Sequence, residues 1–530
     1  MARPSRYSPE VRERSVKPVI DQPDKLAALV LSALTLAGAA CASSGRAEPF
    51  VWPRESWETG SPESQGMDSA ELAAMLERLA ENNPGIRSVS VIRSGTLVLD
   101  ARVAPFPADG RQLVYSCTKS VLSALVGIAV AEDELAGVDA RVLDLHPSSA
   151  AAGTEDAKRA LRLEHLLTMS TGLETEDNWL HGWRGLSAMR RSEDWPGYVL
   201  SRALIAQPGE RFEYSNGVSH LLGVVPQEAV GETAHDYARE RLFDPLGIGD
   251  TDWELDNEGR NLGYAGLRIH PLDLARIGYL YLRGGEWDGE RVLSADWVEA
   301  SLSARIEAGT LAEGYGYQWW IHEDGVKAMY GHAGQCVFLV PEHDLVVVFV
   351  SAMPSRYFFT PLRLLHEYVI PAVRSRDVLR ERPSNLARLE AAKAVLGTQE
   401  REHARPLPAA AQAASGRRYA FAPNASGLRA LTPRFDPGGA EVTLVLDYGG
   451  VVMEIPVGLD GTFRYSKQRG EPWAFRARWE DDATLFIEQE LLSRANRRRT
   501  TLRLHEDGLD FESIELVDGH EESLRATLAD

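Results

Sequence analysis

The stretch YSCTKSVLSALVG, residues 115 to 127, constrains the fold of this 530-residue chain more than any other segment. From Val121 to Val130 the sequence is apolar on every side, which is typical of a helix buried in the core of a domain. Lys119 is embedded in this apolar helix without a solvent face, and a buried lysine needs a partner or a chemical purpose. The segment therefore predicts a core helix with a functional group near its start.

Ser116 and Lys119 are three positions apart, so a helix that starts at Ser116 brings the lysine beside the serine oxygen. A serine hydroxyl is a poor nucleophile until a base takes its proton. The helix N-terminus favours an alkoxide, and burial lowers the pKa of a lysine toward a value useful for a base. A serine helix cap followed by a surface lysine has the same spacing, but the apolar context favours the nucleophile.

A second segment, PGERFEYSNG at residues 208 to 217, places Tyr214 and Asn216 two positions apart after a Pro-Gly turn. There Tyr214 can relay a proton with Lys119, and the Asn216 amide can hold Lys119 or a substrate carbonyl. Taken singly, this pattern also fits an exposed loop.

A third segment, GHAGQC at residues 331 to 336, leads into a predicted strand. Its glycines let another group approach the backbone, so a backbone N–H near Gln335 can pair with that of Ser116 to bind an oxyanion. His332 alone also fits a structural histidine.

Together these motifs resemble the serine hydrolases related to class C β-lactamases and penicillin-binding proteins. The order is Ser116-x-x-Lys119, then Tyr214-x-Asn216, then His332-Ala333-Gly334. The similarity extends to LRLEHLLTMSTGL (161–173), GLRIHPLDLARIGYLYLRGGEWDGERVL (266–293) and GYGYQWW (314–320), and so covers residues 50 to 375. It implies an α+β domain of the β-lactamase-like or transpeptidase-like type, with an antiparallel sheet and a helical subdomain.

The resemblance also implies roles for the motif residues. Ser116 would be acylated, Lys119 and Tyr214 would share the general base and acid work, and Asn216 would position Lys119 and the substrate. The N–H groups of Ser116 and Gln335 would form the oxyanion hole. His332 and Gly334 would lie on the substrate side of the site, and no metal or cofactor is implied.

One departure from the family pattern bears on the substrate. The third motif usually carries Lys-Thr-Gly or Lys-Ser-Gly, whose lysine attracts a substrate carboxylate, and here His332 takes that place. A neutral or weakly charged imidazole binds a carboxylate less well. We therefore expect a hydrolase of small esters or amides; the alternatives are a cell-wall D,D-peptidase or weak β-lactamase, and a non-catalytic binding protein with this fold.

Two further segments could border the site. The acidic run LETEDNW (173–179) places Glu174, Glu176 or Asp177 where a substrate ammonium could bind, or else forms a solvated loop. Trp319 and Trp320 could line the acyl site, although one of them should lie in the core.

Beyond residue 375 the composition changes. We expect a linker at 376–415, because RPLPAAAQAASG (405–416) is rich in Pro and Ala without an apolar period. Residues 416–530 contain short alternating segments separated by turns, which predict a β-sandwich or barrel whose role stays open.

The first 42 residues predict export: basic residues precede the uncharged run LAALVLSALTLAGAACA (26–42). LAGAAC resembles a bacterial lipobox, so we expect either lipidation at Cys41 or simple cleavage, and a periplasmic or membrane-anchored protein. The net charge of −20 argues against nucleic-acid binding. The other two cysteines, Cys117 and Cys336, are expected to be small buried hydrophobes, with a disulfide between them left open.

Overall fold

The structure of the protein is a computed structural model that describes residues 50–145, 156–178, 182–309 and 311–529. The expected export segment, residues 1 to 42 with Cys41, lies outside these ranges, so its cleavage and lipidation stay predictions. Within the described ranges, no helix combines the length and the apolar character that crossing a membrane requires.

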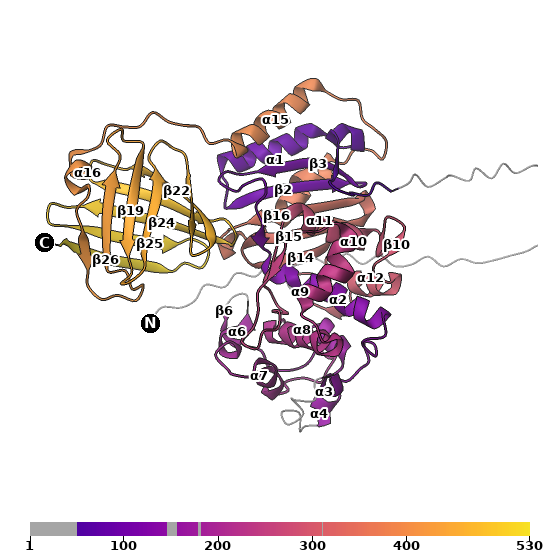
Figure 1. Ribbon diagram of the computed structural model, residues 1–530. Coiled ribbons are helices and arrows are strands. Elements are labelled where there is room, and N and C mark those ends of the chain that lie inside the picture. The colour runs from indigo at the N-terminus through magenta and orange to yellow at the C-terminus, as the bar shows by residue number, and fades with distance from the viewer. Residues whose placement is uncertain (1–49, 146–155, 179–181, 310, 530) are drawn as a thin grey trace, which may run out of the picture. The chain divides into compact units, whose positions relative to one another are not determined.

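A nine-stranded sheet forms the centre of the first domain (Figure 1). Its strands lie in the order β1 (Glu58–Thr59), β3 (Thr96–Arg102), β2 (Ile86–Arg93), β16 (Leu345–Ser351), β15 (Gln335–Val340), β14 (Lys327–Gly331), β13 (Trp320–Ile321), β12 (Gly314–Tyr315) and β11 (Ile306–Glu307). The short β1 pairs parallel to β3, whereas β2 pairs antiparallel with β3 and with β16. The sheet is thus mixed at one edge, where an antiparallel sheet was expected.

Strands β2 and β3 form a hairpin around Ser94-Gly95, β14, β15 and β16 pair antiparallel in sequence, and β15 is the strand predicted after GHAGQC. Helix α1 (Ser69–Glu81) begins after Asp68, whose carboxylate accepts a hydrogen bond from the Ala70 N–H and caps the helix. Helix α11 (Pro271–Leu282) packs against β15 and β16. The buried valines and leucines of these strands form the core with both helices.

A helical subdomain lies between β4 (Gln112–Leu113) and β11. Its main helices are α2 (Thr118–Ala131), which is buried as predicted, and α8 (Asn216–Val230). The others are α3 (Val142–Leu145), α4 (Asp156–Arg159), α5 (Leu163–Leu167), α6 (Arg184–Met189), α7 (Trp195–Ser201), α9 (Ala234–Ala238), α10 (Asp244–Leu246) and α12 (Ala295–Leu302). A small sheet of β4 (Gln112–Leu113), β8 (Leu267–Ile269) and β7 (Asp252–Trp253) fixes the chain just before Ser116.

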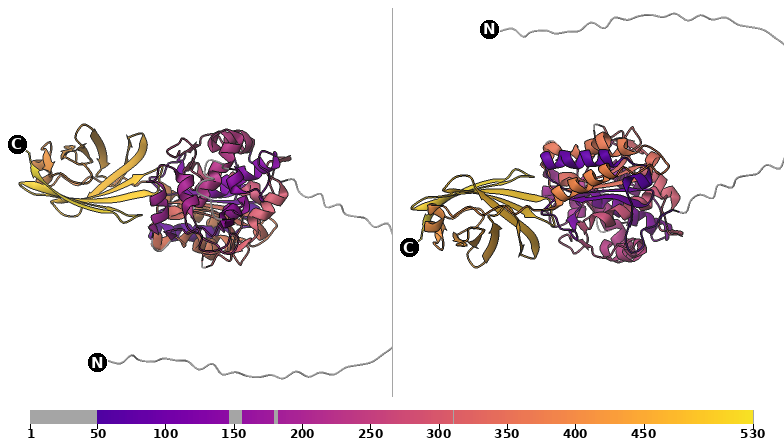
Figure 2. Two further views of the ribbon diagram at one scale, coloured as in Figure 1. Left: turned by 90° about the horizontal axis from the view of Figure 1, so that it is seen from below. Right: turned by 90° about the horizontal axis from the view of Figure 1, so that it is seen from above.

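The C-terminal strands form a β-barrel, one of the two expected architectures (Figure 2). Its strands are β17 (Tyr419–Phe421), β18 (Ala430–Phe435), β19 (Glu441–Asp447), β20 (Val452–Gly458), β21 (Arg464–Gln468), β22 (Glu471–Trp479), β23 (Thr484–Leu491), β24 (Asn496–Leu504), β25 (Gly508–Glu515) and β26 (Glu521–Leu528). Pairing of Gly458 on β20 with Arg476 on β22 closes a ring of nine strands, and β21 pairs only with β22.

The segment expected to be a linker, residues 376–415, contains two packed helices. Helix α15 (Pro383–Gly397) lies beside α1 (Figure 1), and its Leu389 and Leu396 belong to the core of the first domain. Helix α16 (Ala409–Ala414) buries Ala411 and Ala414 in the barrel core. The expected linker is therefore wrong over these helices, because small residues without an obvious apolar period still fill gaps beside a larger apolar surface.

Candidate active site

Ser116 lies in a short 3-10 turn, Tyr115–Cys117, which leads directly into α2. The backbone of Tyr115 has φ 48°, a left-handed conformation that is uncommon for a side chain of this size and often marks a functional site. The Val114 N–H donates to the Leu267 carbonyl at 2.9 Å, so β8 holds the turn in place. Ser116 itself is half-buried, so its hydroxyl is held in place and still within reach of a substrate.

Lys119 is buried, with 1% of its surface exposed, as its sequence context predicted. Its Nζ donates to Ser116 Oγ at 2.9 Å, to Asn216 Oδ1 at 2.9 Å and to the Tyr264 carbonyl at 2.8 Å. All three acceptors are uncharged. Burial therefore lowers the pKa of Lys119 from 10.5 to about 7, although the Asp177 carboxylate acts in the opposite direction. Near neutral pH this amine can take a proton from Ser116.

Tyr214 also lies close to the lysine, with its ring centroid 5.0 Å from Lys119 Nζ. Trp320 stacks on the ring at a centroid distance of 5.8 Å. Trp319 and Trp320 are both buried in the core, so the expectation of one core tryptophan is met, and a role for Trp320 at the acyl site stays a prediction. Burial raises the pKa of Tyr214 well above its usual value of 10, and a hydrogen bond with Ser116 lowers it in part. Tyr214 therefore keeps its proton at neutral pH and can act as a proton donor.

Asn216 begins α8 and bridges Lys119 to a carboxylate. While its Oδ1 accepts from Lys119, its Nδ2 and its backbone N–H both donate to Asp177 Oδ2 at 3.1 Å. The other Asp177 oxygen accepts from the Leu186 N–H at 2.8 Å. The amide thus places a neutral spacer between the lysine and the carboxylate.

Within the acidic run, Glu174 and Glu176 are exposed, as expected of a solvated loop, whereas Asp177 has neither of the two expected roles. Asp177 is only 8% exposed, and both of its oxygens accept hydrogen bonds from the protein, so it is neither a solvated loop residue nor a free ammonium site. Glu174 forms an ion pair with Arg202 at 2.9 Å, and Glu176 is exposed. The sequence indicated Asp177 only through its position in an acidic run before the Tyr214 motif. It did not indicate that the carboxylate contacts Asn216.

The third motif lies against the Ser116 turn. A Cβ added to Gly331 at the end of β14 would lie 2.3 Å from the Val114 carbonyl oxygen, so only glycine allows this approach. Ala333 and Gly334 both have positive φ, at 60° and 89°, and the turn they form leads into β15.

Gln335 begins β15 beside this turn. Its carbonyl accepts from Cys117 Sγ at 3.5 Å, while its buried amide bonds to the backbone of His332 and Ser351. The three motifs predicted from the sequence therefore come together around Ser116. Cys117 and Cys336 are both free and buried, as expected of small hydrophobes.

The barrel domain reaches this site through two turns, which the sequence did not predict. His332 Nε2 lies 3.2 Å from Asp518 Oδ1 in the turn between β25 and β26, and its ring packs edge-on against Tyr115 at 5.2 Å. The hydrogen bond to His332 lowers the pKa of Asp518. In the turn between β23 and β24, the Ala495 N–H donates to the Tyr115 hydroxyl at 3.1 Å.

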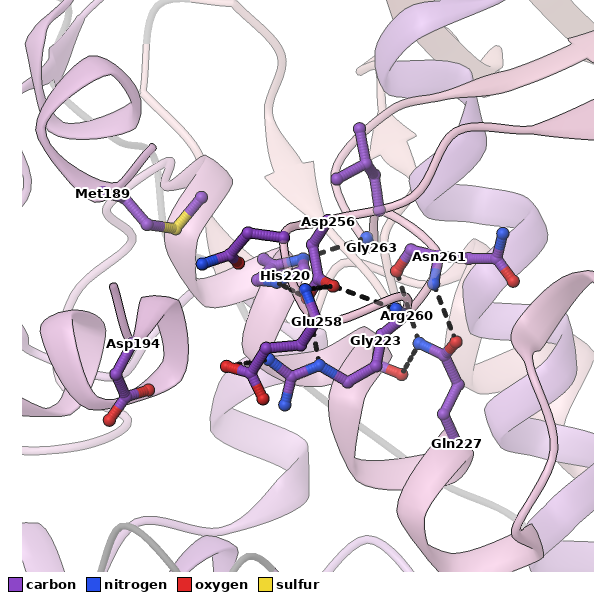
Figure 3. Close-up of polar contacts among 12 residues, drawn as sticks. Met189, Asp194, His220, Gly223, Gln227, Asp256, Glu258, Arg260, Asn261 and Gly263 are labelled. Atoms are coloured by element: carbon purple, nitrogen blue, oxygen red, sulfur yellow. Dashed lines mark hydrogen bonds and ion pairs between the residues drawn. The ribbon is translucent and has the colours of Figure 1, made fainter. Parts of the chain in front are cut away.

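A second buried polar cluster lies one helical turn further along α8 from Asn216 (Figure 3). His220, one turn after Asn216, has its Nε2 3.2 Å from Asp256 Oδ2, and its Nδ1 accepts from the Gly263 N–H at 3.4 Å. These two contacts assign the proton to Nε2. Gly263 precedes Tyr264, whose carbonyl binds Lys119, so this cluster positions a partner of Lys119.

Asp256 receives donors from several directions. Arg260 Nε donates to Oδ2 at 3.0 Å, and the backbone N–H groups of Glu258 and Arg260 donate to Oδ1 at 2.8 and 2.9 Å. Burial acts to raise the pKa of Asp256, but these hydrogen bonds and that from His220 hold it well below its usual range. Burial lowers the pKa of His220, which is therefore neutral at pH 7. In the described parts of the chain, no group of three or more His, Cys, Asp or Glu side chains is placed to hold a metal ion.

Comparison with known proteins places these motifs in a family. A family model described as Beta-lactamase matches residues 72–365, which include all three motifs. The chain is 24% identical over 317 residues to the 6-aminohexanoate-dimer hydrolase of Paenarthrobacter ureafaciens, spanning 54% of this chain and 80% of that protein. It is 29% identical over 367 residues to Penicillin-binding protein 4 of Amycolatopsis lactamdurans, spanning 60% and 90%. The solved octameric penicillin-binding protein homologue from Pyrococcus abyssi matches 87% of this chain and 100% of its own, with a TM-score of 0.46 and 19% identity.

Proposed function

The chain belongs to the Beta-lactamase family of hydrolases, and from that premise we propose that it cleaves small ester or amide bonds through an acyl-enzyme on Ser116. The observation that carries the proposal is the contact of Lys119 Nζ with Ser116 Oγ at 2.9 Å. The lysine has only uncharged acceptors, and its pKa is lowered to about 7. A neutral amine beside a serine hydroxyl is the arrangement that a nucleophile needs.

In the proposed acylation, Ser116 Oγ attacks the substrate carbonyl and its proton passes to Lys119. The N–H groups of Ser116 and Gln335 stabilise the oxyanion that forms. The intermediate then breaks its bond to the leaving alcohol or amine, which takes a proton from Tyr214, and Lys119 returns a proton to Tyr214. Because the pKa of Tyr214 is raised and that of Lys119 is lowered, we assign the acid role to the tyrosine and the base role to the lysine.

In the proposed deacylation, water attacks the acyl group and gives one proton to Lys119, which is neutral again after acylation and later returns this proton to Ser116 Oγ. The bond from the acyl carbon to Ser116 Oγ breaks, the serine regains a proton, and a carboxylic acid leaves. Asn216 keeps Lys119 in place through both steps, since its amide is itself held by Asp177.

The charge around His332 supports a substrate without a carboxylate at this position. Asp518 lies 3.2 Å from the imidazole, and its side chain is 57% exposed, so it presents a negative charge at the third motif. A substrate carboxylate would meet this charge where related enzymes carry a lysine. This observation favours neutral or cationic esters and amides over β-lactams and peptides with a free C-terminal carboxylate.

The test is intact-mass analysis of the purified protein after exposure to a fluorophosphonate and, separately, to penicillin. We expect one fluorophosphonate adduct that is absent in Ser116→Ala, and no stable penicillin adduct. A stable penicillin adduct would instead support the cell-wall peptidase or weak β-lactamase alternative. If neither reagent forms an adduct, the protein is a non-catalytic member of the fold.

We also propose that the protein is exported and acts in the periplasm or on a membrane, through cleavage or lipidation near Cys41. The basic N-terminus and the uncharged run at residues 26 to 42 support this location. Fractionation of cells that express the full chain, with intact-mass analysis of the N-terminus, tests it. A lipid-bearing Cys41 supports the anchored form, cleavage near Ala42 without lipid supports a free periplasmic protein, and an uncleaved cytosolic chain contradicts export.

A further inference from the structure

The C-terminal barrel contains a cavity of about 450 Å³, partly open to solvent, that the proposed chemistry at Ser116 does not use. This volume lies within the range of pockets that hold small organic molecules. Much of its wall is apolar and includes Leu444, Ile455, Trp473, Phe475, Ile487 and Phe511. A closed barrel of this size has room inside for one small ligand when its inward side chains do not fill it.

One side of the cavity is polar. Gln489 on β23 donates to Thr500 Oγ1 on β24 at 2.6 Å, and Thr500 donates to Ser513 Oγ on β25 at 3.0 Å. Arg498, two residues before Thr500 on β24 and therefore on the same inward face, donates from Nη1 to Ser513 Oγ at 3.4 Å. These four side chains form a continuous polar strip beside the apolar part of the wall.

Arg498 is the charged member of this strip and is only lightly used by the fold. Among the described residues, no carboxylate forms an ion pair with its guanidinium, and the long contact with Ser513 is its hydrogen bond from the side chain. A guanidinium has five N–H donors in a planar fork that fits a carboxylate. Arg469, Glu471 and Glu522 also line the cavity, so an anion there meets both attractive and repulsive charges.

The cavity lies at the end of the barrel that contacts the active-site motifs. Leu491 lines the cavity and ends β23, and the turn that follows contains Ala495, which bonds to Tyr115. Ser513 and Glu522 line the cavity and pair across β25 and β26, and the turn between them contains Asp518, which contacts His332. The cavity wall therefore continues into both turns that touch the hydrolase site.

From this geometry we propose that the barrel cavity binds an amphipathic monocarboxylic acid, with its apolar part against Phe475 and Ile487 and its carboxylate on Arg498. The polar strip sets the orientation of the ligand, and the apolar wall gives most of the affinity. A carboxylic acid is also the class of product that hydrolysis of an ester or amide releases. The binding site itself does not depend on the proposed function, because none of its residues takes part in the acyl-enzyme chemistry.

Calorimetric titration of the Ser116→Ala protein with decanoate, decan-1-ol and decylammonium tests this proposal. The substitution removes turnover and acylation, so the result is independent of the hydrolase activity. We expect one decanoate per chain, bound at least about tenfold more tightly than either of the other two probes, since a bidentate contact between a guanidinium and a carboxylate is strong. Equal or tighter binding of decanol or decylammonium, or no decanoate binding, would overturn the proposal.

Matched substitutions locate the site. Arg498→Gln should weaken decanoate binding about tenfold and leave decanol binding unchanged, whereas Arg499→Gln, on the exposed outward face of the same strand, should change neither. Glu522→Gln should tighten decanoate binding. Ile487→Trp should fill the cavity and remove binding of all three probes. If Ile487→Trp does not fold, the comparison of Arg498→Gln with Arg499→Gln still tests the proposal. Equal losses of decanoate affinity in these two variants would contradict binding inside the barrel.

Discussion

Helix α8 takes part in two buried polar clusters one turn apart, and only one of them can titrate near neutral pH. Asn216 belongs to the cluster around Lys119, and His220 belongs to the cluster around Asp256. The central side chain of each cluster is almost completely buried and well hydrogen-bonded. Burial and hydrogen bonding therefore do not distinguish the two.

The two clusters differ in whether the partners stabilise the charged form of the central side chain. Lys119 donates only to neutral oxygens, so burial disfavours its ammonium form and its pKa falls to about 7. Asp256 accepts from Arg260, His220 and the backbone, so its carboxylate is stabilised and its pKa is held well below the usual range. A buried group with an oppositely charged partner keeps one state, whereas one with neutral partners can exchange a proton at neutral pH.

The largest expected effect follows from removing the titrating amine. Lys119→Met should lower kcat/KM for an ester substrate by about a thousandfold or more, because loss of a general base costs about 10² to 10⁴ in rate. The control is Lys393→Met, since Lys393 is an outward lysine paired with Glu390 on α15. A loss of less than about tenfold in Lys119→Met would mean that another group takes the proton from Ser116.

The lowered pKa of Lys119 also makes the free energy of unfolding depend on pH. Because the folded pKa of Lys119 lies below its ordinary value of 10.5, the unfolded chain binds one more proton between about pH 7 and 10.5. The free energy of unfolding of the native protein should therefore rise with pH across this window. Denaturant titrations should show this rise in the native protein and its reduction in Lys119→Met.

Asp256→Ala tests the structural cluster. Breaking a buried charge pair costs about 3 kcal/mol, so the free energy of unfolding should fall by about this amount, with Glu258→Ala on the same loop as the milder control. Since the pKa of Asp256 is lowered on folding, its contribution is full above the unfolded value of 3.8 and is lost as the pH falls further. The pH midpoint of activity should not move, and a shift of that midpoint would show that the two clusters titrate together.

Asn216→Asp should give Lys119 an oppositely charged partner, like the partner that Arg260 provides for Asp256. A carboxylate in direct contact with Lys119 favours the ammonium form and should shift the midpoint of the kcat/KM profile by about one pH unit or more to the alkaline side. Asn216→Ala removes the same acceptor without adding charge and should lower kcat/KM without an alkaline shift. Identical pH profiles for the two variants would contradict the spacer role of the amide.

The smallest expected effect concerns the pair at the mouth of the site, where His332 faces Asp518. Half-exposed ion pairs contribute about 1 kcal/mol or less, so Asp518→Asn should lower KM for an ester that carries a carboxylate by up to about fivefold. KM for a neutral ester should stay the same. Asp507→Asn, at the opposite end of the barrel, is the control, and a similar change in both variants would indicate a general charge effect.

The sequence predicted the components of the site better than their connections. Ser116, Lys119, Tyr214 and Asn216 could be identified because each lies in a short motif whose spacing has a chemical reason. The contact of Asp177 with Asn216 could not be predicted, because it joins the start of α8 to a residue 39 positions earlier, and their relative position depends on tertiary packing. His220 and Asp256 lie in separate segments that share no sequence pattern, so their contact could not be predicted either.

The fold shows the same limit. The β2–β3 hairpin, α1, α2 and the late strands follow from apolar periodicity and caps within single segments. Helices α15 and α16 were missed because Ala-rich segments with few large apolar residues resemble a linker until the surface they cover is known. The contact of Asp518 with His332 joins residues 186 positions apart, and no local pattern in either segment predicts it.

The central claim is that a neutral Lys119 activates Ser116, and its most direct test is the rate of fluorophosphonate labelling of Ser116 as a function of pH, followed by intact mass. The account predicts a rate that rises about tenfold per pH unit below neutrality and levels off above a midpoint near 7, with no adduct in Ser116→Ala. A rate that keeps rising through pH 10, as an ordinary lysine would require, or one that does not depend on pH, would contradict it.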